Sequence, residues 1–323
     1  MDLMTGMIET PAHDCALCPM CQLAAAPALA QSGERPGQGQ AIVTLLPEHG
    51  NGDPGPVSQQ QLNLKVDGKQ VEITGWQPLQ GANDGVELVV LIDQGARSSL
   101  GNQLADVANF IKSLPPNTRA TIGYMENGRA ALTGPLSTDR AQILRGLHIP
   151  AGSPGIDASP YFCLSDLAKS WPSQDQQARR EVVMISDGVD YYDRRYDPED
   201  PYVESAITDS VRARMIVYSI YWRNTGRLDR SLYENNAGQN LLLQVTQATG
   251  GNSYWEGIGN PVSIDPYLGD IRRRLNNQYE LSFSYPVGRK PEVESMKLKV
   301  NGGQAKADAP LQVFVGHAPV PGA

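Results

Sequence analysis

The sequence has no block of basic residues and little charge of either sign. Lys, Arg, Asp and Glu together make up 19% of its 323 residues, and the formal net charge is −8. Proteins that bind nucleic acid or anionic membrane surfaces through charge carry clustered Lys and Arg. We therefore expect no nucleic-acid-binding function.

Recognisable catalytic motifs are also lacking. The four histidines are scattered, and only His148 falls within the central part of the chain. No G-x-S-x-G elbow, phosphate-binding loop or H-E-x-x-H metal motif occurs. Asp93 and Asp187 are conceivable as an acid/base pair, but no nucleophile or cleft signature accompanies them. We expect a protein that is not an enzyme.

Cysteine is rare after the first thirty residues. Cys163 lies at helical spacing among apolar residues, which predicts a buried free thiol. The other three, Cys15, Cys18 and Cys21, form a C-x-x-C-x-x-C pattern that out of context suggests an iron–sulfur or zinc site. We favour a different interpretation, because these cysteines lie in an apolar stretch and a fourth ligand is not obvious.

Residues 1–30 are predicted to be a secretory signal peptide. Their second half reads CALCPMCQLAAAPALA, uncharged and mostly apolar, with a small-residue cleavage site after Ala30. The first half holds Asp2, Glu9 and Asp14 but no Lys or Arg, which fits an atypical signal or a misassigned start codon. No later run is long and apolar enough to span a bilayer. We expect export from a bacterial cell to the periplasm, the envelope or the medium.

Residues 85–277 alternate between apolar strands and amphipathic helices. Val86–Ile92 and Glu181–Ile185 are almost continuously apolar, as in strands buried on both faces of a parallel sheet. A hairpin centred on Asn127-Gly128 predicts one antiparallel edge strand. Helices are expected at 100–114, 139–147, 161–171, 202–215, 239–248 and 264–276. The pattern predicts an α/β fold with a doubly wound, mostly parallel sheet.

Both ends of the chain are predicted to be β-rich. Residues 31–84 combine a flexible lead-in with an alternating pattern around Asp67-Gly68, which indicates a hairpin. Alternation returns in residues 278–323. Since these C-terminal segments have no core of their own, we expect them to pack with residues 41–78 in a small β-sandwich built from both chain ends.

Two of the predicted parallel strands end in an aspartate, Asp93 in LIDQGARSS and Asp187 in MISDGVD. Ligands of open α/β sheets bind at the carboxyl ends of the strands. Two carboxylates at adjacent strand tips supply the hard oxygen ligands that Mg²⁺ prefers. The alternative is that each aspartate caps the following helix by accepting hydrogen bonds from free N–H groups. The two roles are compatible.

In their order and spacing, residues 86–99, 152–167 and 182–190 resemble a von Willebrand factor A domain. Together with the upstream KVDGKQVEIT hairpin and the downstream TGG and NQYEL segments, the chain resembles the VWFA-related domain proteins of Acidobacteria over roughly residues 41–315. The resemblance implies a metal-ion-dependent adhesion site for Mg²⁺ or Mn²⁺. In the family that site uses Asp-x-Ser-x-Ser, a Thr from a middle loop and a second Asp.

Carried onto this sequence, the family's site is degenerate. The candidate metal ligands are two aspartates and three hydroxyl residues: Asp93, Asp187, Ser153, Ser98 and Ser99. Ser159 is a less favoured substitute for Ser153. Gly95 and Arg97 stand where the motif has serines. A guanidinium near the site disfavours a cation and can neutralise both aspartates, unless it points into solvent.

The loop after Asp187, DGVDYYDRRYDPEDPY, groups acidic residues with tyrosines and arginines. Tyr and Arg are enriched at binding hot spots, and the alternative is a merely solvated loop. The candidate partner-binding residues are Arg97, Asp190, Tyr191, Tyr192, Arg194, Arg195 and Tyr196. The favoured interpretation is a non-enzymatic module that binds a protein or glycan. The alternatives are a structural or assembly scaffold of the cell envelope and, less favoured, a metal-dependent hydrolase.

Overall fold

The structure is a computed structural model that describes residues 35–50, 52–80, 85–150, 158–193, 197, 199–224, 231–257, 259–287, 291–302 and 305–317. The predicted signal peptide with its three cysteines lies outside these residues, as do Ser153, Arg194, Arg195 and Tyr196. Within the described ranges, no helix is long and apolar enough to cross a membrane.

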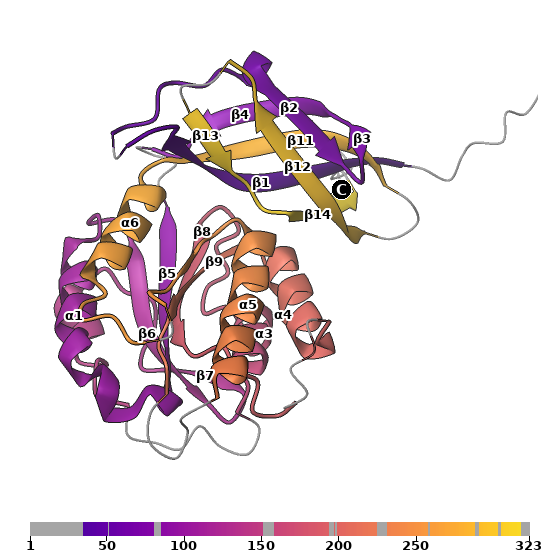
Figure 1. Cartoon of the computed structure of the whole chain (residues 1–323). Helices are drawn as coiled ribbons and strands as arrows, with labels where there is room; N and C mark the ends of the chain where they lie inside the picture. The colour runs from indigo at the N-terminus through magenta and orange to yellow at the C-terminus, as the bar shows by residue number, and fades with distance from the viewer. Residues whose placement is uncertain are drawn as a thin grey trace, which may run out of the picture. The chain divides into compact units, whose positions relative to one another are not determined.

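Six strands form a sheet in the order β10-β9-β8-β5-β6-β7 (Figure 1). Their bounds are β5 Val86–Asp93, β6 Arg119–Glu126, β7 Arg129–Leu132, β8 Arg179–Ser186, β9 Met215–Tyr221 and β10 Ser253–Tyr254. Neighbours from β10 to β6 pair in parallel, and β7 pairs antiparallel with β6. The predicted hairpin turn is confirmed: Asn127 and Gly128 have φ of 51° and 71°, as a type I′ turn requires.

Helices cover both faces of this sheet. Their bounds are α1 Leu104–Ser113, α2 Arg140–Leu144, α3 Pro160–Lys169, α4 Pro201–Arg212, α5 Leu232–Thr249 and α6 Asp265–Leu275, with a 3₁₀ segment at Gln94–Gln103. Leu88, Val90 and Ile92 of β5 share one apolar core with α1 and α6, whereas Val89 and Leu91 share the other with α3, α4 and α5 (Figure 1). Burial on both faces explains why this strand is apolar throughout.

Two predicted helices begin elsewhere than expected. The helix predicted from Leu100 begins at Leu104, because the residues before it form the 3₁₀ segment. Helix α5 begins at Leu232 rather than at residue 239, since Ser231 and Glu234 form a reciprocal capping box there. The predicted buried free thiol is confirmed at Cys163, which is 1% exposed.

Strands from both chain ends pair antiparallel along one path, β3-β2-β12-β14-β1-β11-β4, with β13 also paired to β1. Their bounds are β1 Arg35–Pro47, β2 Leu62–Val66, β3 Lys69–Gln70, β4 Glu72–Pro78, β11 Gln278–Val287, β12 Glu292–Val300, β13 Ala305–Asp308 and β14 Gln312–His317, and a 3₁₀ turn lies at Gln59–Gln61. We call this set of strands the β unit. The expected sandwich is thus one hydrogen-bonded path rather than two separately bonded sheets, because β12 pairs with β14 through its first half and with β2 through its second.

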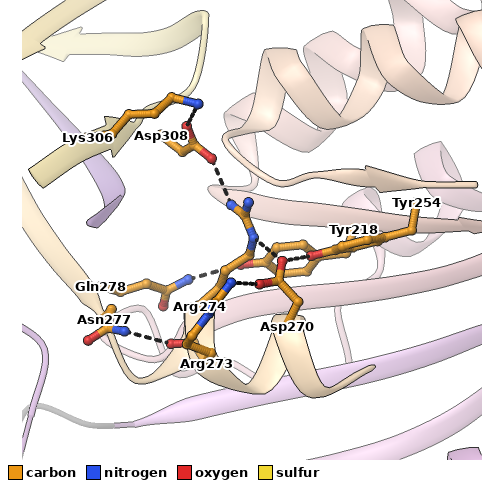
Figure 2. Close-up of polar contacts among 9 residues, drawn as sticks. All are labelled: Tyr218, Tyr254, Asp270, Arg273, Arg274, Asn277, Gln278, Lys306 and Asp308. Atoms are coloured by element: carbon orange, nitrogen blue, oxygen red, sulfur yellow. Dashed lines mark hydrogen bonds and ion pairs between the residues drawn. The ribbon is translucent and has the colours of Figure 1, made fainter. Parts of the chain in front are cut away.

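A buried polar network joins β8, β9 and β11. Gln278 donates from Nε2 to Glu181 Oε1 at 2.9 Å and to Tyr218 Oη at 3.3 Å, and Figure 2 shows the contact with Tyr218. The Arg179 guanidinium donates to Gln278 Oε1 and, at 2.9 Å, to the Leu275 carbonyl. Glu181 is 0% exposed, and this burial raises its pKa to about 8 against the opposing effects of Arg179 and Gln278.

We expect Glu181→Gln to flatten the dependence of stability on pH. The folded pKa of about 8 lies above the ordinary value of 4.5, so folding favours the protonated acid, and this contribution is lost as the pH rises through that interval. Relative to the variant, the wild type should lose about 3 kcal/mol of unfolding free energy between about pH 5 and about pH 8. Urea unfolding at both pH values measures the difference, and parallel pH profiles for the two proteins would contradict the prediction.

A second polar network joins α6 to β13 (Figure 2). Arg274, only 6% exposed, donates from Nε to Asp270 Oδ2 and from Nη1 to Asp308 Oδ2, both at 2.8 Å. Tyr254 donates to Asp270 Oδ2 at 2.7 Å, and the exposed Lys306 pairs with Asp308 Oδ1 at 3.3 Å. Arg274 is therefore the residue through which both carboxylates are joined.

Candidate functional site

Asp93 is the last residue of β5 and Asp187 directly follows the neighbouring parallel strand β8, so both lie at the carboxyl edge of the six-stranded sheet. Asp93 is 4% exposed; its Oδ1 accepts a hydrogen bond from the Gly95 N–H at 2.7 Å, and its Oδ2 accepts one from Ser186 Oγ at 2.8 Å. The first bond caps the 3₁₀ segment, so one of the two roles considered from the sequence, helix capping, is present at Asp93.

Asp187 is fully buried and contacts a residue that the sequence analysis missed. Its Oδ1 accepts from the Val189 N–H at 3.0 Å, and its Oδ2 accepts from Asn224 Nδ2 at 2.6 Å. Asn224 Nδ2 also lies 3.0 Å from Tyr191 Oη. Asn224 follows shortly after β9, the next parallel strand along the sheet. Its position after a third apolar strand was the signal that could have placed it beside the aspartates.

The side chains around Asp93 and Asp187 do not fit a metal-ion-dependent adhesion site. Gly95 offers no hydroxyl, and a Cβ atom added to it would lie 2.6 Å from Asn224 Nδ2 and 3.0 Å from Asp93 Oδ1. The Asn224 amide thus fills the space into which a serine would extend. An N–H₂ group donates hydrogen bonds and cannot coordinate a cation. Within the described part of the chain, no three or more His, Cys, Asp and Glu residues are grouped so that they could hold a metal ion.

The candidate hydroxyl ligands make other contacts. Ser99 Oγ donates to the Ala96 carbonyl at 2.5 Å and accepts from Trp222 Nε1 at 2.9 Å. Ser98 is exposed, and Ser159 accepts from the Phe162 N–H at 3.4 Å as the N-cap of α3. None of these contacts brings a hydroxyl oxygen to Asp187, so these serines do not complete a ligand set with both aspartates.

Arg97 has a strained backbone beside the aspartates. Its φ of 50° and ψ of −150° fall in a region that is essentially restricted to glycine. The side chain is half-buried, and its Nε has no hydrogen-bond partner. Among the described residues, no hydrogen bond or ion pair joins this guanidinium to Asp93 or Asp187.

We expect Arg97→Gly to be more stable than Arg97→Ala. Both variants lose the side chain, but only glycine adopts the observed backbone angles without strain, and the difference should be about 1 kcal/mol in unfolding free energy. Denaturant unfolding of the two variants measures it. A glycine variant less stable than the alanine variant would show that this backbone conformation carries no strain.

In the loop after β8, two of the three described candidate binding residues, Asp190 and Tyr191, point inward. Asp190 is buried, its Oδ1 accepts from the Tyr192 N–H at 2.8 Å, and burial raises its pKa to about 6. Tyr191 faces Asn224. Tyr192, by contrast, is 52% exposed, with its ring 5.1 Å from that of Phe162 and 5.3 Å from that of Tyr202. Of the three described candidates in this loop, only Tyr192 presents a large surface to a partner.

Exposed apolar side chains gather at this same edge. Among the described residues, six of the seven large hydrophobic side chains that are exposed lie on loops or helix starts at the carboxyl ends of the strands: Ile149, Tyr192, Leu232, Tyr233, Trp255 and Val262. We call these six residues the apolar edge set. The seventh, Leu311, directly precedes β14 of the β unit. Of these six residues only Tyr192 was predicted from the sequence, because isolated apolar residues in loops form no periodic pattern.

No protein-family model and no curated protein matches this sequence. Among solved structures, an aerotolerance-related membrane protein from Bacteroides fragilis is 14% identical, covering 59% of this chain and 99% of that one with a TM-score of 0.41. The conserved hypothetical protein BatB from Bacteroides thetaiotaomicron is 14% identical, covering 59% and 97% with a TM-score of 0.43. Proximal thread matrix protein 1 from the mussel byssus, described with a zinc-occupied MIDAS motif, is 13% identical, covering 62% and 47% with a TM-score of 0.39. Similarity at this level supports no conclusion about function.

Proposed function

We propose that residues 85–277 are a von Willebrand factor A-like domain of the Acidobacteria VWFA-related type, doubly wound, and that the β unit from both chain ends packs with it. In this proposal the chain is an exported, non-enzymatic module that binds a protein or glycan partner. The partner contacts the loops at the carboxyl edge of the six-stranded sheet. The observation that carries the proposal is the concentration of exposed apolar side chains at that edge.

The aromatic members of the apolar edge set supply the contact surface. Tyr192, Tyr233 and Trp255 are 52%, 66% and 40% exposed. Aromatic side chains are enriched among the residues that contribute most to binding. Burying their apolar surface against a partner stabilises the complex by about 25 cal/mol for each Å² removed from water. Exposed apolar residues scattered singly need no explanation, but their accumulation on one edge favours a binding surface.

Burial of the two strand-tip aspartates favours binding over catalysis. Asp93 and Asp187 are 4% and 0% exposed, and each accepts hydrogen bonds from neighbouring described groups. A general acid or base must lie within hydrogen-bond reach of the substrate. Because both carboxylates are buried and already hydrogen-bonded, a hydrolase is the weaker proposal.

The competing proposal is an envelope scaffold in which the β unit makes the contacts. Leu311 is its one large hydrophobic side chain that is exposed among the described residues, at 52%. Its exposure equals that of Tyr192, and it lies next to β14 of the β unit rather than among the edge loops. Leu311 is therefore a matched control for the edge.

Capture from envelope extracts tests the two proposals. We expect a Tyr192→Ser, Tyr233→Ser double variant to retain about tenfold less of the captured partner than the wild type, because hot-spot aromatics each contribute more than about 1 kcal/mol. Leu311→Ser should capture as the wild type does, with or without chelator. Loss of capture in Leu311→Ser alone would instead favour the scaffold proposal.

A further inference from the structure

We infer that the Asn224 side-chain amide takes the place between Asp93 and Asp187 that a divalent cation takes in a metal-ion-dependent adhesion site. The carboxyl edge of the sheet is then held together without a metal. The inference that partner binding needs no metal rests on the proposed function. The position of the amide does not depend on that function.

The position of the amide follows from its distance to Asp187 and from its proximity to Gly95, which lies beside Asp93. Asn224 Nδ2 lies 2.6 Å from Asp187 Oδ2. The point where a Gly95 Cβ would stand lies 2.6 Å from the same nitrogen and 3.0 Å from Asp93 Oδ1. Asn224 is 0% exposed, so its amide is buried beside the two strand ends.

The direction of the amide follows from the chemistry of its neighbour. An ionised carboxylate only accepts hydrogen bonds, so the amide group that faces Asp187 Oδ2 must be the N–H₂ donor. Turning the amide over would set Asn224 Oδ1 against the carboxylate, which is favourable only with a cation between them. Tyr191 Oη, which can donate or accept, is satisfied either way.

Gly95 and Asn224 are therefore a matched pair. The absence of a side chain at Gly95 is what makes room for the amide. This accounts for the departure from the family's Asp-x-Ser-x-Ser motif at that position. A serine there should clash while Asn224 is present and fit once the amide is removed.

A double-mutant cycle tests the pairing by thermal unfolding. Gly95→Ser and Asn224→Gly should each lower Tm by roughly 5 °C, and the double variant should lose at least about 3 °C less than the sum of the two. Gly269→Ser, at a helical position with no atom within 4 Å of an added Cβ, should combine additively with Asn224→Gly. An additive Gly95/Asn224 cycle would overturn the pairing.

Manganese titration of the full chain tests the absence of a cation. We expect no saturable Mn²⁺ binding by paramagnetic resonance or calorimetry, and the same Tm in Mn²⁺ as in chelator. Saturable binding that is abolished by Asp187→Asn would overturn the inference and make Asn224 Oδ1 a candidate ligand. Since no partner is present in this measurement, its failure would leave the proposed binding function standing.

Discussion

Gly238→Ala is expected to lower the free energy of unfolding by about 3 kcal/mol, although alanine normally stabilises a helix. Gly238 lies inside α5, and an added Cβ would stand 2.1 Å from the Asp187 carbonyl oxygen and 3.0 Å from Val189 Cγ2. Because the first obstacle is backbone, α5 must move away from the end of β8. Denaturant unfolding measures the loss.

Gly269→Ala is the matched control for this prediction. Gly269 also lies inside a helix, α6, but no atom stands within 4 Å of an added Cβ. Alanine should therefore stabilise the protein there by about 0.5–1 kcal/mol, which is its ordinary advantage over glycine in a helix. If Gly238→Ala did not destabilise the protein, close packing of α5 against the loop after β8 would be contradicted.

Arg274→Ala is expected to cost about 3 kcal/mol of unfolding free energy, because it leaves two carboxylates without their shared guanidinium. Arg274 is 6% exposed and joins Asp270 on α6 to Asp308 on β13 (Figure 2). Burial alone raises the pKa of Asp270, but hydrogen bonds from Arg274, Tyr254 and Arg273 leave that pKa below its usual value. The ionised carboxylate therefore depends on these donors.

Lys306→Ala is the control for Arg274→Ala. Lys306 pairs with the same Asp308, but its side chain is 67% exposed. Ion pairs in that setting contribute about 0–1 kcal/mol, so the variant should unfold almost as the wild type does. If Lys306→Ala proved as destabilising as Arg274→Ala, the burial of Arg274 would not be the source of its effect. Urea unfolding at neutral pH compares the two.

Much of the α/β secondary structure was predictable because periodicity is strong where burial is strong. β5 is buried along its whole length, so its apolar run marks it directly. The turn at Asn127-Gly128 was equally clear, since few residue pairs adopt two positive φ angles. The start of α5 was missed because Leu232–Gly238 has no apolar periodicity and its beginning is set by a cap at Ser231.

The candidate site was only partly predictable. Asp93 and Asp187 were found because one ends and the other directly follows an apolar strand. Asn224 was not, since a neutral residue two positions beyond Trp222 suggests no chemistry until the strands are placed side by side. The strain at Arg97 was also invisible, because it is a backbone property that no side-chain pattern records. Local sequence therefore predicts which strands end at the carboxyl edge of the sheet. It predicts less well which side chains lie between the ends of those strands.

Site-specific photo-crosslinking in the envelope tests whether the partner binds at the carboxyl edge of the sheet. A photoreactive phenylalanine analogue replaces Tyr233 in one protein and Leu311 in another, since these side chains are 66% and 52% exposed. We predict a discrete crosslinked product from position 233 and none from position 311. A product from position 311 alone would show that the partner does not bind at the carboxyl edge and would assign partner binding to the β unit.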